Sequence, residues 1–394
     1  METLRDINVV DVSHAGAMPF AAMILADNGA QVIKVESPSG DHFRFSLRGS
    51  IMASINRNKR GIAINLKKEE GKEILRKLVC KADVFLENFV PGAMEKLGFG
   101  YQDVSKLNPR IIYASISGFG QTGPQKNRPG YDVIAQAMSG IMMATGEKDR
   151  PPVRFGTSCI DFGAGMFAAI GVLLALRDRE KTGIGQNIDV SLLETGLSWM
   201  NHFVTLYSIS GELPQRIGSA LPFLAPYQVF ETSDGFVFIG VSTDSYWRSF
   251  CDLFSLTLLE KDPKYQTNDD RVANRDDLIS ILAPIIKKQS SITVLEKLQV
   301  AGIPHAPLLR VDEIIKNEQV IHRNIIHKMT HPEYGEIKIV KTPIFRNGKV
   351  ADIRIPAPML GQHTREVLIE LGYNNEEITS MEINKDVIIN KAPM

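Results

Sequence analysis

The segment GTSCIDFGAG, residues 156–165, places one carboxylate, Asp161, at the start of an uncharged stretch. From Phe162 to Leu176 the chain consists mostly of Ala, Ile, Leu, Met and Gly. An Asp in such a position is most often a helix cap, because its oxygens accept hydrogen bonds from the free N–H groups of the first turn. It can also be a reactive carboxylate held where water is scarce. Taken alone, Asp161 is better explained as a helix cap, and only the rest of the sequence can favour a reactive carboxylate instead.

Two further features could take part in chemistry. Cys159 lies two residues before Asp161, but it has no basic neighbour in the sequence, so an inert thiol is favoured over a nucleophile. The segment NRNKRG, residues 56–61, carries three cations beside an expected strand. A run this short is typical of a solvated turn, and a phosphate contact is the alternative.

The motifs of several common enzyme classes are absent. The loop after the first expected strand reads SHAGAMPF and lacks G-x-G-x-x-G, and the sequence has no P-loop and no G-x-S-x-G elbow. HKMTH lacks the H-E-x-x-H pattern and runs into Pro332, which favours a loop over a metal site. A redox enzyme, an ATP-dependent enzyme and a serine hydrolase are therefore disfavoured, and no metal is expected.

The balance of charge argues against large anionic partners. Lys plus Arg and Asp plus Glu both number 45, so nothing in the net charge attracts nucleic acid or a membrane. The three cysteines are far apart, which is typical of a reducing compartment. The N-terminal residues do not resemble a signal peptide, and the apolar run of residues 162–176 is shorter than the ~20 residues that span a bilayer. We therefore expect a cytoplasmic protein without a nucleic-acid or membrane partner.

Alternating strands and helices are expected to position these residues. The strand-like segments are INVVDVS, AQVIKVE, GIAINL, DVFLENF and RIIYASIS, and helix-like segments such as PFAAMILADNG and KKEEGKEILRKLVCKA separate them. This alternation predicts an α/β domain with a mostly parallel sheet. Such sheets bind ligands beyond the carboxyl ends of their strands, so we expect the site at the loops after Val12, Glu87 and Ser117.

The length of 394 residues predicts two domains. The pattern of expected strands and helices changes beyond about residue 210, which predicts a large α/β domain at residues 1–210 and a smaller α/β domain at residues 220–328. In the latter, the polar stretch DPKYQTNDDRVANRDDL is expected to precede the helix ISILAPIIKK. The tail, residues 329–394, contains an expected helix that begins near Thr364 and is closed by Gly372.

Many ordered segments resemble one enzyme family, the class III CoA-transferases, which includes formyl-CoA:oxalate, carnitine and succinate–hydroxymethylglutarate CoA-transferases. The resemblance runs from the first strand to residue 373. The segments that carry it are ADNGAQVIKVESP, NRNKRGIAINLK, DVFLENFVPGAMEKLG, IIYASISGFGQTGP, RPGYDVIAQAMSG, KTGIGQNIDVSLLE, DPKYQTNDDRVANRDDL, AGIPHAPL and LGQHTREVLIELGY.

The resemblance implies an architecture and a nucleophile. It implies a large Rossmann-like parallel-sheet domain and a smaller α/β domain, with the C-terminal tail packed on the large domain. Two such chains are expected to interlock as an obligate homodimer. The family nucleophile is an Asp just ahead of an apolar helix, which matches Asp161 and now favours chemistry over a simple cap. Acyl-CoA and a small carboxylic acid are the expected substrates, and no tightly bound cofactor is expected.

The resemblance also implies contacts with CoA. This chain has Gly16 where oxalate-specific members carry Gln, Met18 in place of a common Gly, and Pro129 where some members carry Lys. GVSTDSYW, around Ser242, lacks the glycine-rich loop of the oxalate enzymes. The expected contact residues are Gly16, Ala17, Ile64, Asn65, Leu66, Lys67, Asn88, Phe89, Val90, Lys96, Gly130 and Tyr131.

The expected reaction is transfer of CoA through a covalent aspartyl intermediate. Burial would raise the pKa of Asp161, whereas a helix that starts there would keep the carboxylate ionised. Backbone N–H groups around Gly163–Gly165 are one possible source of oxyanion stabilisation. The expected acceptor is a small dicarboxylate, with an acetyl- or succinyl-type donor.

Two alternatives stay open. The related 2-methylacyl-CoA racemases carry a His at the position of Tyr131, and a Tyr with a pKa of about 10 is a poor replacement in two-base proton exchange. A non-catalytic CoA-binding protein is the second alternative.

Overall fold

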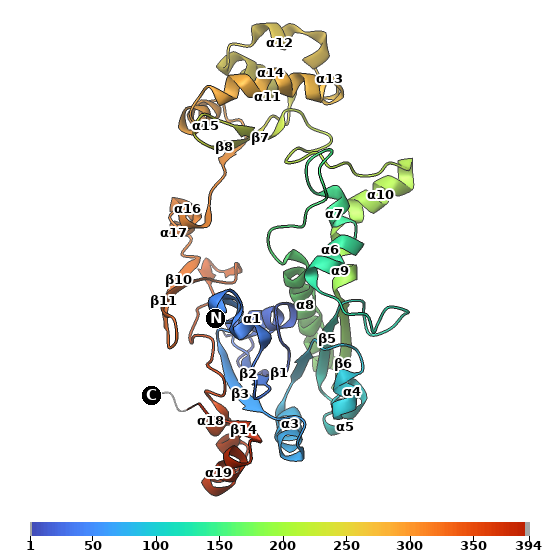
Figure 1. Ribbon diagram of the computed structural model, residues 1–394, viewed down its shortest axis with the longest axis vertical. Helices are drawn as coiled ribbons and strands as arrows, with labels where there is room; N and C mark the ends of the chain where they lie inside the picture. Colours follow the sequence, from blue (N-terminus) through green and yellow to red (C-terminus); the bar gives the residue numbers. More distant parts are fainter. Residues whose placement is uncertain (1, 391–394) are drawn as a thin grey trace. The chain divides into compact units, whose positions relative to one another are not determined.

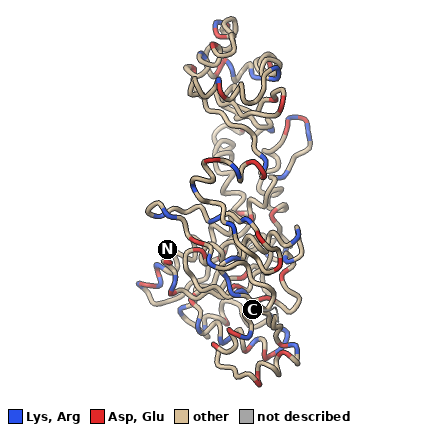
Figure 2. Tube along the Cα trace, turned by 90° about the vertical axis from the view of Figure 1, so that its left-hand side faces the viewer, with Lys and Arg blue, Asp and Glu red and all other residues tan. Residues whose placement is uncertain are grey.

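The computed structural model describes residues 2–390, which form two compact units. Unit 1 takes in the residues up to Ile141, the segment Phe155–Val204 and the residues from Glu318 onward, and unit 2 comprises Met142–Arg154 and Thr205–Asn317. The assignment of residues 142–154 to the second unit was not expected from the sequence. Lys and Arg alternate with Asp and Glu along the traces of both units (Figure 2).

A seven-stranded sheet forms the centre of unit 1, with strand order β14-β3-β2-β1-β4-β5-β6. The strands β1 to β6 are parallel, and the five strands expected from the sequence are among them (Figure 1). The edge strand β14 is antiparallel, with Val387 beside Ile64, so the sheet is mixed rather than purely parallel. The strands are β1 (Asn8–Asp11), β2 (Gln31–Glu36), β3 (Lys59–Ile64), β4 (Val84–Glu87), β5 (Ile112–Ser117), β6 (Gln186–Ser191) and β14 (Val387–Ile388).

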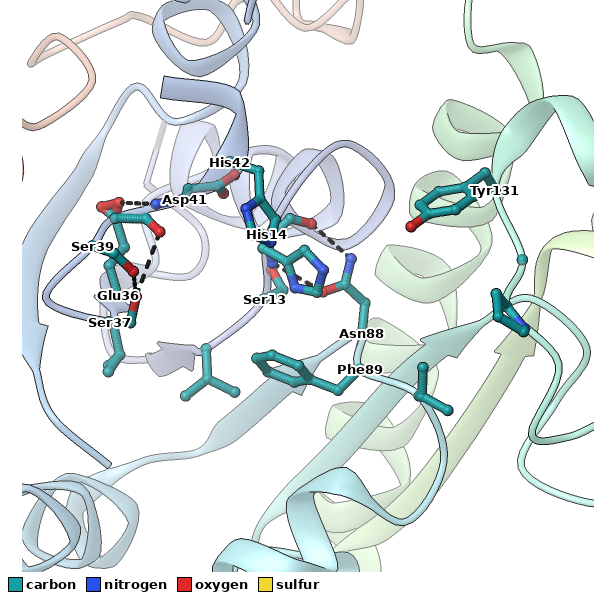
Figure 3. A pocket seen from close by; sticks show the side chains of 16 residues that line it. Ser13, His14, Glu36, Ser37, Ser39, Asp41, His42, Asn88, Phe89 and Tyr131 are labelled. Carbon is teal, nitrogen blue, oxygen red and sulfur yellow. Dashed lines mark hydrogen bonds between the residues drawn. The ribbon is translucent and has the colours of Figure 1, made fainter. Parts of the chain in front are cut away.

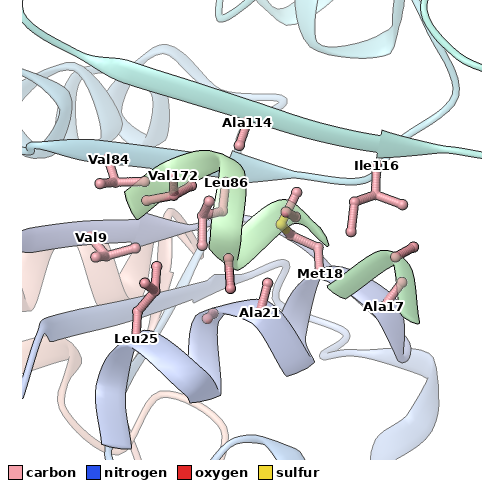
Figure 4. Close-up of a cluster of buried hydrophobic side chains, with 14 of the residues drawn as sticks. Val9, Ala17, Met18, Ala21, Leu25, Val84, Leu86, Ala114, Ile116 and Val172 are labelled. Carbon is pink, nitrogen blue, oxygen red and sulfur yellow. The ribbon is translucent and has the colours of Figure 1, made fainter. Parts of the chain in front are cut away.

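Helices cover both faces of this sheet, which explains the near-continuous apolar strands. On one face, Val9, Leu86 and Ala114 of the strands pack against α1 (Ala17–Asp27) and α8 (Cys159–Thr182), as Figure 4 shows. On the other face, the strands pack against α3 (Glu69–Lys81), α5 (Tyr101–Leu107), α18 (Thr364–Glu370) and α19 (Asn375–Ile383).

Helix α8 is longer than the sequence indicated, because it begins at Cys159 and ends at Thr182, with Gly183 as a left-handed C-cap. By length and composition it could cross a membrane, but half of its most apolar window is buried inside the fold. Gly165 allows its close contact with α1, since a Cβ there would lie 2.5 Å from the carbonyl oxygen of Ala17.

Unit 1 also contains short helices and two pairs of strands, and α7 and α10 lie where the chain passes from one unit to the other. The β10–β11 and β12–β13 pairs are both antiparallel. HKMTH lies in strand β10 rather than in the expected loop, and His331 Nε2 donates to the carbonyl oxygen of Ala357. The elements are η1 (His42–Arg44), η2 (Ser46–Gly49), α2 (Ser50–Ile55), α4 (Ala93–Leu97), α6 (Asp132–Met138), α7 (Ile141–Ala144), α9 (Leu192–Trp199), α10 (Asn201–Ser210), α17 (Glu318–His322), β10 (Ile326–His331), β11 (Gly335–Val340), β12 (Phe345–Arg346) and β13 (Lys349–Val350).

Unit 2 contains a three-stranded antiparallel sheet, β7-β8-β9, packed against helices. Its core includes Trp247, Phe250 and Leu282. The polar stretch before α14 is partly helical, because Thr267 and Asp270 form a capping box that starts α13. The elements are β7 (Tyr227–Glu231), β8 (Phe236–Gly240), β9 (His305–Pro307), α11 (Asp244–Leu253), α12 (Thr257–Lys261), η3 (Pro263–Tyr265), α13 (Asn268–Ala273), α14 (Arg275–Lys287), α15 (Ser291–Val300) and α16 (Val311–Ile314).

Candidate active site

A cavity of about 390 Å³ opens at the carboxyl ends of the central strands of unit 1. It lies where the strand order reverses between β1 and β4, which is the usual ligand site of such sheets. The expected loops after β1, β4 and β5 all contribute to it, together with the loop after β2. Figure 3 shows Tyr131 facing His14 and Asn88 across this cavity. We call it the switch-point cavity.

Asn88 connects the loop after β4 to the loop after β1 through two hydrogen bonds with His14. Its Oδ1 accepts the backbone N–H of His14 at 2.9 Å, and its Nδ2 donates to the His14 carbonyl oxygen at 2.7 Å. The His14 ring lies 5.0 Å from the Phe89 ring and 5.7 Å from the His42 ring, between centroids. Burial lowers the pKa of His14, so this ring is neutral near pH 7, and its buried Nδ1 contacts no hydrogen-bond partner among the described residues.

A buried ionic network fixes the loop after β1. Lys34 Nζ donates to the carbonyl oxygen of Ser13 at 3.0 Å and lies 3.2 Å from Asp41 Oδ2. Asp41 in turn accepts the N–H of Ala15, whose φ of 64° is unusual for a residue with a side chain. Together these contacts hold the loop in the conformation that leads into α1.

Two of the three cations of NRNKRG form buried ion pairs, so the expectation of a solvated turn is wrong for Arg57 and Lys59. The third, Arg60, pairs with the exposed Glu366 and Glu370. Arg57 pairs with Asp27 at 2.7 Å, and Lys59 pairs with Asp11 at 2.9 Å. Both lysine and arginine are buried, because β3 begins at Lys59 and lies inside the sheet. Burial lowers the pKa of Lys59 to about 8, while Asp11 opposes that shift. These side chains do not line the switch-point cavity, which argues against a phosphate contact there.

Asp132, rather than Asp161, caps helix α8. Its Oδ2 accepts the N–H of Ile160 at 2.8 Å and that of Asp161 at 3.2 Å. The simple capping interpretation of Asp161 is therefore wrong, and its own carboxylate is left for other contacts. Sequence reasoning missed Asp132, which lies 29 residues before Asp161 and directly after Tyr131.

Gln136 completes this arrangement from the next turn of α6. It donates a hydrogen bond to Asp132, and its Oε1 accepts the N–H of Phe155 at 2.8 Å. The two buried side chains thus hold both ends of the segment 155–161. The spacing of Asp132 and Gln136, four residues apart, was the available signal, because residues at this spacing share one face of a helix.

The Asp161 carboxylate lies against the N-terminus of α1. A Cβ added to Gly16, the N-cap of that helix, would lie only 2.9 Å from Asp161 Oδ2. The N–H groups of Ala17 and Met18 donate to no described residue, as expected for a first helical turn. Two helix N-termini, those of α1 and α8, therefore lie next to this carboxylate.

The pKa of Asp161 is raised to about 7, first because the group is buried and second because of the nearby Asp132 charge. The condition for a helix that keeps Asp161 ionised, a start at Asp161 itself, is not met, since α8 begins at Cys159 and Asp132 accepts its first N–H groups. Near neutral pH both protonation states are populated. Burial likewise raises the pKa of Cys159, which agrees with an inert thiol.

The structure brings some of the expected contact residues together at the switch-point cavity. A close approach of Gly118 and Gly130 sets the loop of Tyr131, because a Cβ on Gly118 would lie 2.6 Å from the Gly130 Cα. Tyr131 is 69% exposed at the cavity. The expected residues that line the cavity are Asn88, Phe89, Val90, Gly130 and Tyr131, whereas Gly16 lies at Asp161 with Ala17 next to it at the start of α1.

Other expected residues lie outside that cavity. Ile64 is the last residue of β3, is fully buried and pairs with Val387 of β14, and the N–H of Asn65 donates to the carbonyl oxygen of Asp386. Lys96 is exposed on α4. Gly163 and Gly165 lie inside α8, where the helix uses their N–H groups, so the expectation that they stabilise an oxyanion is wrong. Within residues 2–390, no cluster of three or more His, Cys, Asp or Glu could hold a metal ion.

Comparison with known proteins identifies the chain. The model of CoA-transferase family III matches residues 4–364. The chain belongs to this family. It is 38% identical to succinyl-CoA:glutarate CoA-transferase of Mus musculus, covering 94% of this chain and 87% of that one. It is 42% identical to acetyl-CoA:oxalate CoA-transferase of Acetobacter aceti, covering 81% and 84%.

The fold agrees with solved members of the family. A CAIB/BAIF family protein from Brucella suis superposes with a TM-score of 0.86 at 35% identity, covering 94% of this chain and 99% of that one. The protein is therefore a class III CoA-transferase enzyme that acts on acyl-CoA.

Proposed function

We propose that this enzyme transfers CoA from succinyl-CoA to a small dicarboxylate through a covalent intermediate on Asp161. The observation that carries the proposal is the environment of this carboxylate. It is partly buried, its pKa is raised to about 7, and the N-terminus of α1 lies against it. A nucleophilic carboxylate needs this combination of reactivity and nearby N–H donors.

In the proposed reaction, ionised Asp161 attacks the thioester carbonyl of the donor. The C–S bond breaks, and a mixed anhydride and the CoA thiolate form. The thiolate attacks the aspartyl carbonyl, which releases the donor acid and leaves an enzyme–CoA thioester. The acceptor carboxylate attacks that thioester, and the released thiolate takes the acceptor acyl group from the second anhydride. Asp161 is regenerated, and because the thioester energy is retained, no ATP is required.

The first N–H groups of α1 are the proposed oxyanion donors. Those of Ala17 and Met18 lie at the N-cap that contacts Asp161 and have no other described acceptor. An oxyanion formed on the aspartyl carbon would therefore meet fixed donors, which cost no reorganisation during the reaction. We propose that CoA occupies the switch-point cavity, in contact with His14, Asn88 and Tyr131. Contacts of CoA with Ile64–Lys67 and Lys96, and a role of Ser242, stay predictions.

A dicarboxylate acceptor is favoured by Gly16 and by the relatives. A side chain at position 16 would contact Asp161, so glycine leaves room for an acid in front of the nucleophile. Proteins named as succinyl-CoA:glutarate, succinate–glutarate and succinyl-CoA:mesaconate CoA-transferases are 34–38% identical to this chain. The oxalate enzyme of Acetobacter aceti is 42% identical, so these identities alone do not rank the acceptors. We place glutarate and related acids ahead of oxalate because Gly16 stands where oxalate-specific members are expected to carry Gln.

We also propose the interlocked homodimer. The outer face of α8 exposes apolar side chains at helical spacing, among them Met166, Ile170 and Leu174. Exposed apolar stripes of this kind mark interaction sites, and a second copy of the chain is the family-typical partner. A cytoplasmic location stays a prediction.

Peptide mass spectrometry after incubation with succinyl-CoA and hydroxylamine tests the mechanism. We expect a hydroxamate on the peptide that contains Asp161, and none in Asp161→Asn, which keeps the size of the side chain. Turnover with glutarate, mesaconate and oxalate then ranks the acceptors. Failure to label Asp161 with any donor would refute the covalent route, and deuterium exchange at the α-carbon of a 2-methylacyl-CoA would then test the racemase.

A further inference from the structure

A second cavity of about 390 Å³ in unit 1 is formed entirely by residues 322–352. It shares no lining residue with the switch-point cavity, and neither Asp161 nor Asp132 borders it. Its walls come from the end of α17, the end of β11 and the β12–β13 hairpin. We call it the hairpin cavity.

Two cationic side chains of the hairpin cavity, those of Arg323 and Lys341, have contacts or burial that position them, whereas Lys349 is exposed. The guanidinium of Arg323 lies 3.7 Å from the centre of the Phe345 ring, a cation–π contact that orients it. Lys341 lines the cavity and is only 5% exposed, so the surrounding residues fix its position. Lys349 follows a two-residue turn with positive φ at Asn347 and Gly348, the tight hairpin turn that this pair of residues favours.

The charge of the hairpin cavity is not balanced. Three cations, Arg323, Lys341 and Lys349, border it together with one carboxylate, Asp352. Lys341 Nζ lies 3.7 Å from Asp352, whose side chain is 84% exposed, so this pair is weak. Arg323 and Lys349 form no ion pair with any residue between 2 and 390. Cations that border one cavity repel one another, and a bound anion would relieve that repulsion.

The titration of a neighbouring histidine is consistent with this field. Burial lowers the pKa of His327 on β10, and the charge of Lys341 lowers it further. The charge of Asp352 opposes this lowering, so the histidine responds to both signs of charge at the cavity.

We propose that the hairpin cavity binds a phosphate group. Arginine and lysine are the usual partners of phosphate oxygens, and an oriented guanidinium can donate two parallel hydrogen bonds. The volume exceeds that of a bare phosphate ion, so the group can be free or attached to a small organic molecule. The site is independent of CoA transfer, because none of its residues belongs to the catalytic arrangement.

Calorimetric titration of the full-length enzyme with inorganic phosphate, at constant ionic strength, tests the site. We expect saturable binding that weakens about tenfold in Lys349→Gln, the loss typical of one hydrogen bond to a charged group. Lys338→Gln is the matched control, because Lys338 is exposed on β11 and does not line the cavity. Arg323→Gln provides a second variant and should weaken binding at least as much.

Equal affinities of the wild type, Lys349→Gln and Lys338→Gln, or heat that never saturates, would overturn the proposal. Titration with adenosine 3′-phosphate distinguishes the source. Tighter binding than that of inorganic phosphate, lost in Lys349→Gln, would identify the phosphate of a nucleotide. Equal binding, also sensitive to Lys349→Gln, would identify the free ion.

Discussion

At the scale of single residues, Asp132 and Asp161 have different roles in this site, one as a helix cap and the other as the proposed nucleophile. One carboxylate accepts the N–H groups at the start of α8, which leaves the other for chemistry. The same neighbour makes ionisation of Asp161 harder, because two close carboxylates repel. The raised pKa makes the Asp161 carboxylate a stronger nucleophile, but it lowers the fraction of Asp161 that is ionised at neutral pH.

Asp132→Asn should separate these two effects. The amide oxygen can still accept the N–H groups of α8, but the negative charge is gone, so the pKa of Asp161 should fall. Because ionised Asp161 is the reactive form, the acid limb of kcat/KM against pH should move to lower pH. Asp132→Ala loses the cap as well and should lower kcat at every pH. An acid limb that stays in place in Asp132→Asn would contradict the electrostatic role.

Asp161→Asn should stabilise the protein at high pH. The folded pKa of about 7 lies above the unfolded value of about 4, so folding favours the protonated carboxyl. The resulting loss of stability grows as the pH rises from 4 to 7 and is complete above 7. We expect the variant to gain about 2 kcal/mol in free energy of unfolding at pH 8 and much less at pH 5. Urea unfolding at both pH values measures this difference, and an equal gain at both would contradict it.

At the scale of elements, contacts close in sequence were predictable and distant ones were not. The strands β1 to β5 and the helices α1 and α3 follow from local apolar patterns. The pairing of Val387 with Ile64 does not, because two apolar residues in a polar tail carry no strand signal of their own. The capping of α8 by Asp132 and the ion pairs of Arg57 and Lys59 also depend on tertiary contacts.

The contact between α1 and α8 gives a prediction at this scale. Gly165→Ala places a methyl group 2.5 Å from the Ala17 carbonyl oxygen, so the two helices must separate. We expect a loss of about 2 kcal/mol in stability and a lower kcat, since α1 also contacts Asp161. Gly171→Ala is the control, because there the nearest atom is a side-chain methyl of Ile188 at 3.0 Å. Thermal unfolding of both variants checks this, and equal melting temperatures would contradict it.

At the scale of the whole molecule, the outer face of α8 is an apolar surface that a single chain leaves exposed to solvent. Leu174→Asp should weaken the proposed homodimer, because it places a charge in an apolar contact. Light scattering after gel filtration should show monomers in this variant. Ile292→Asp, at an exposed position of α15 in unit 2, should leave the mass unchanged. A monomeric wild type, or a dimeric Leu174→Asp, would exclude this face as the interface.

The edge strand β14 also has a consequence for biosynthesis. Strand β3 ends at Ile64, whereas its partner on the outer edge, β14, begins only at Val387. A ribosome therefore releases β3 long before β14 exists, and the open edge of the nascent sheet can pair with other chains throughout elongation. A chain truncated before Val387 would keep Asp161 and leave this edge of the sheet unpaired.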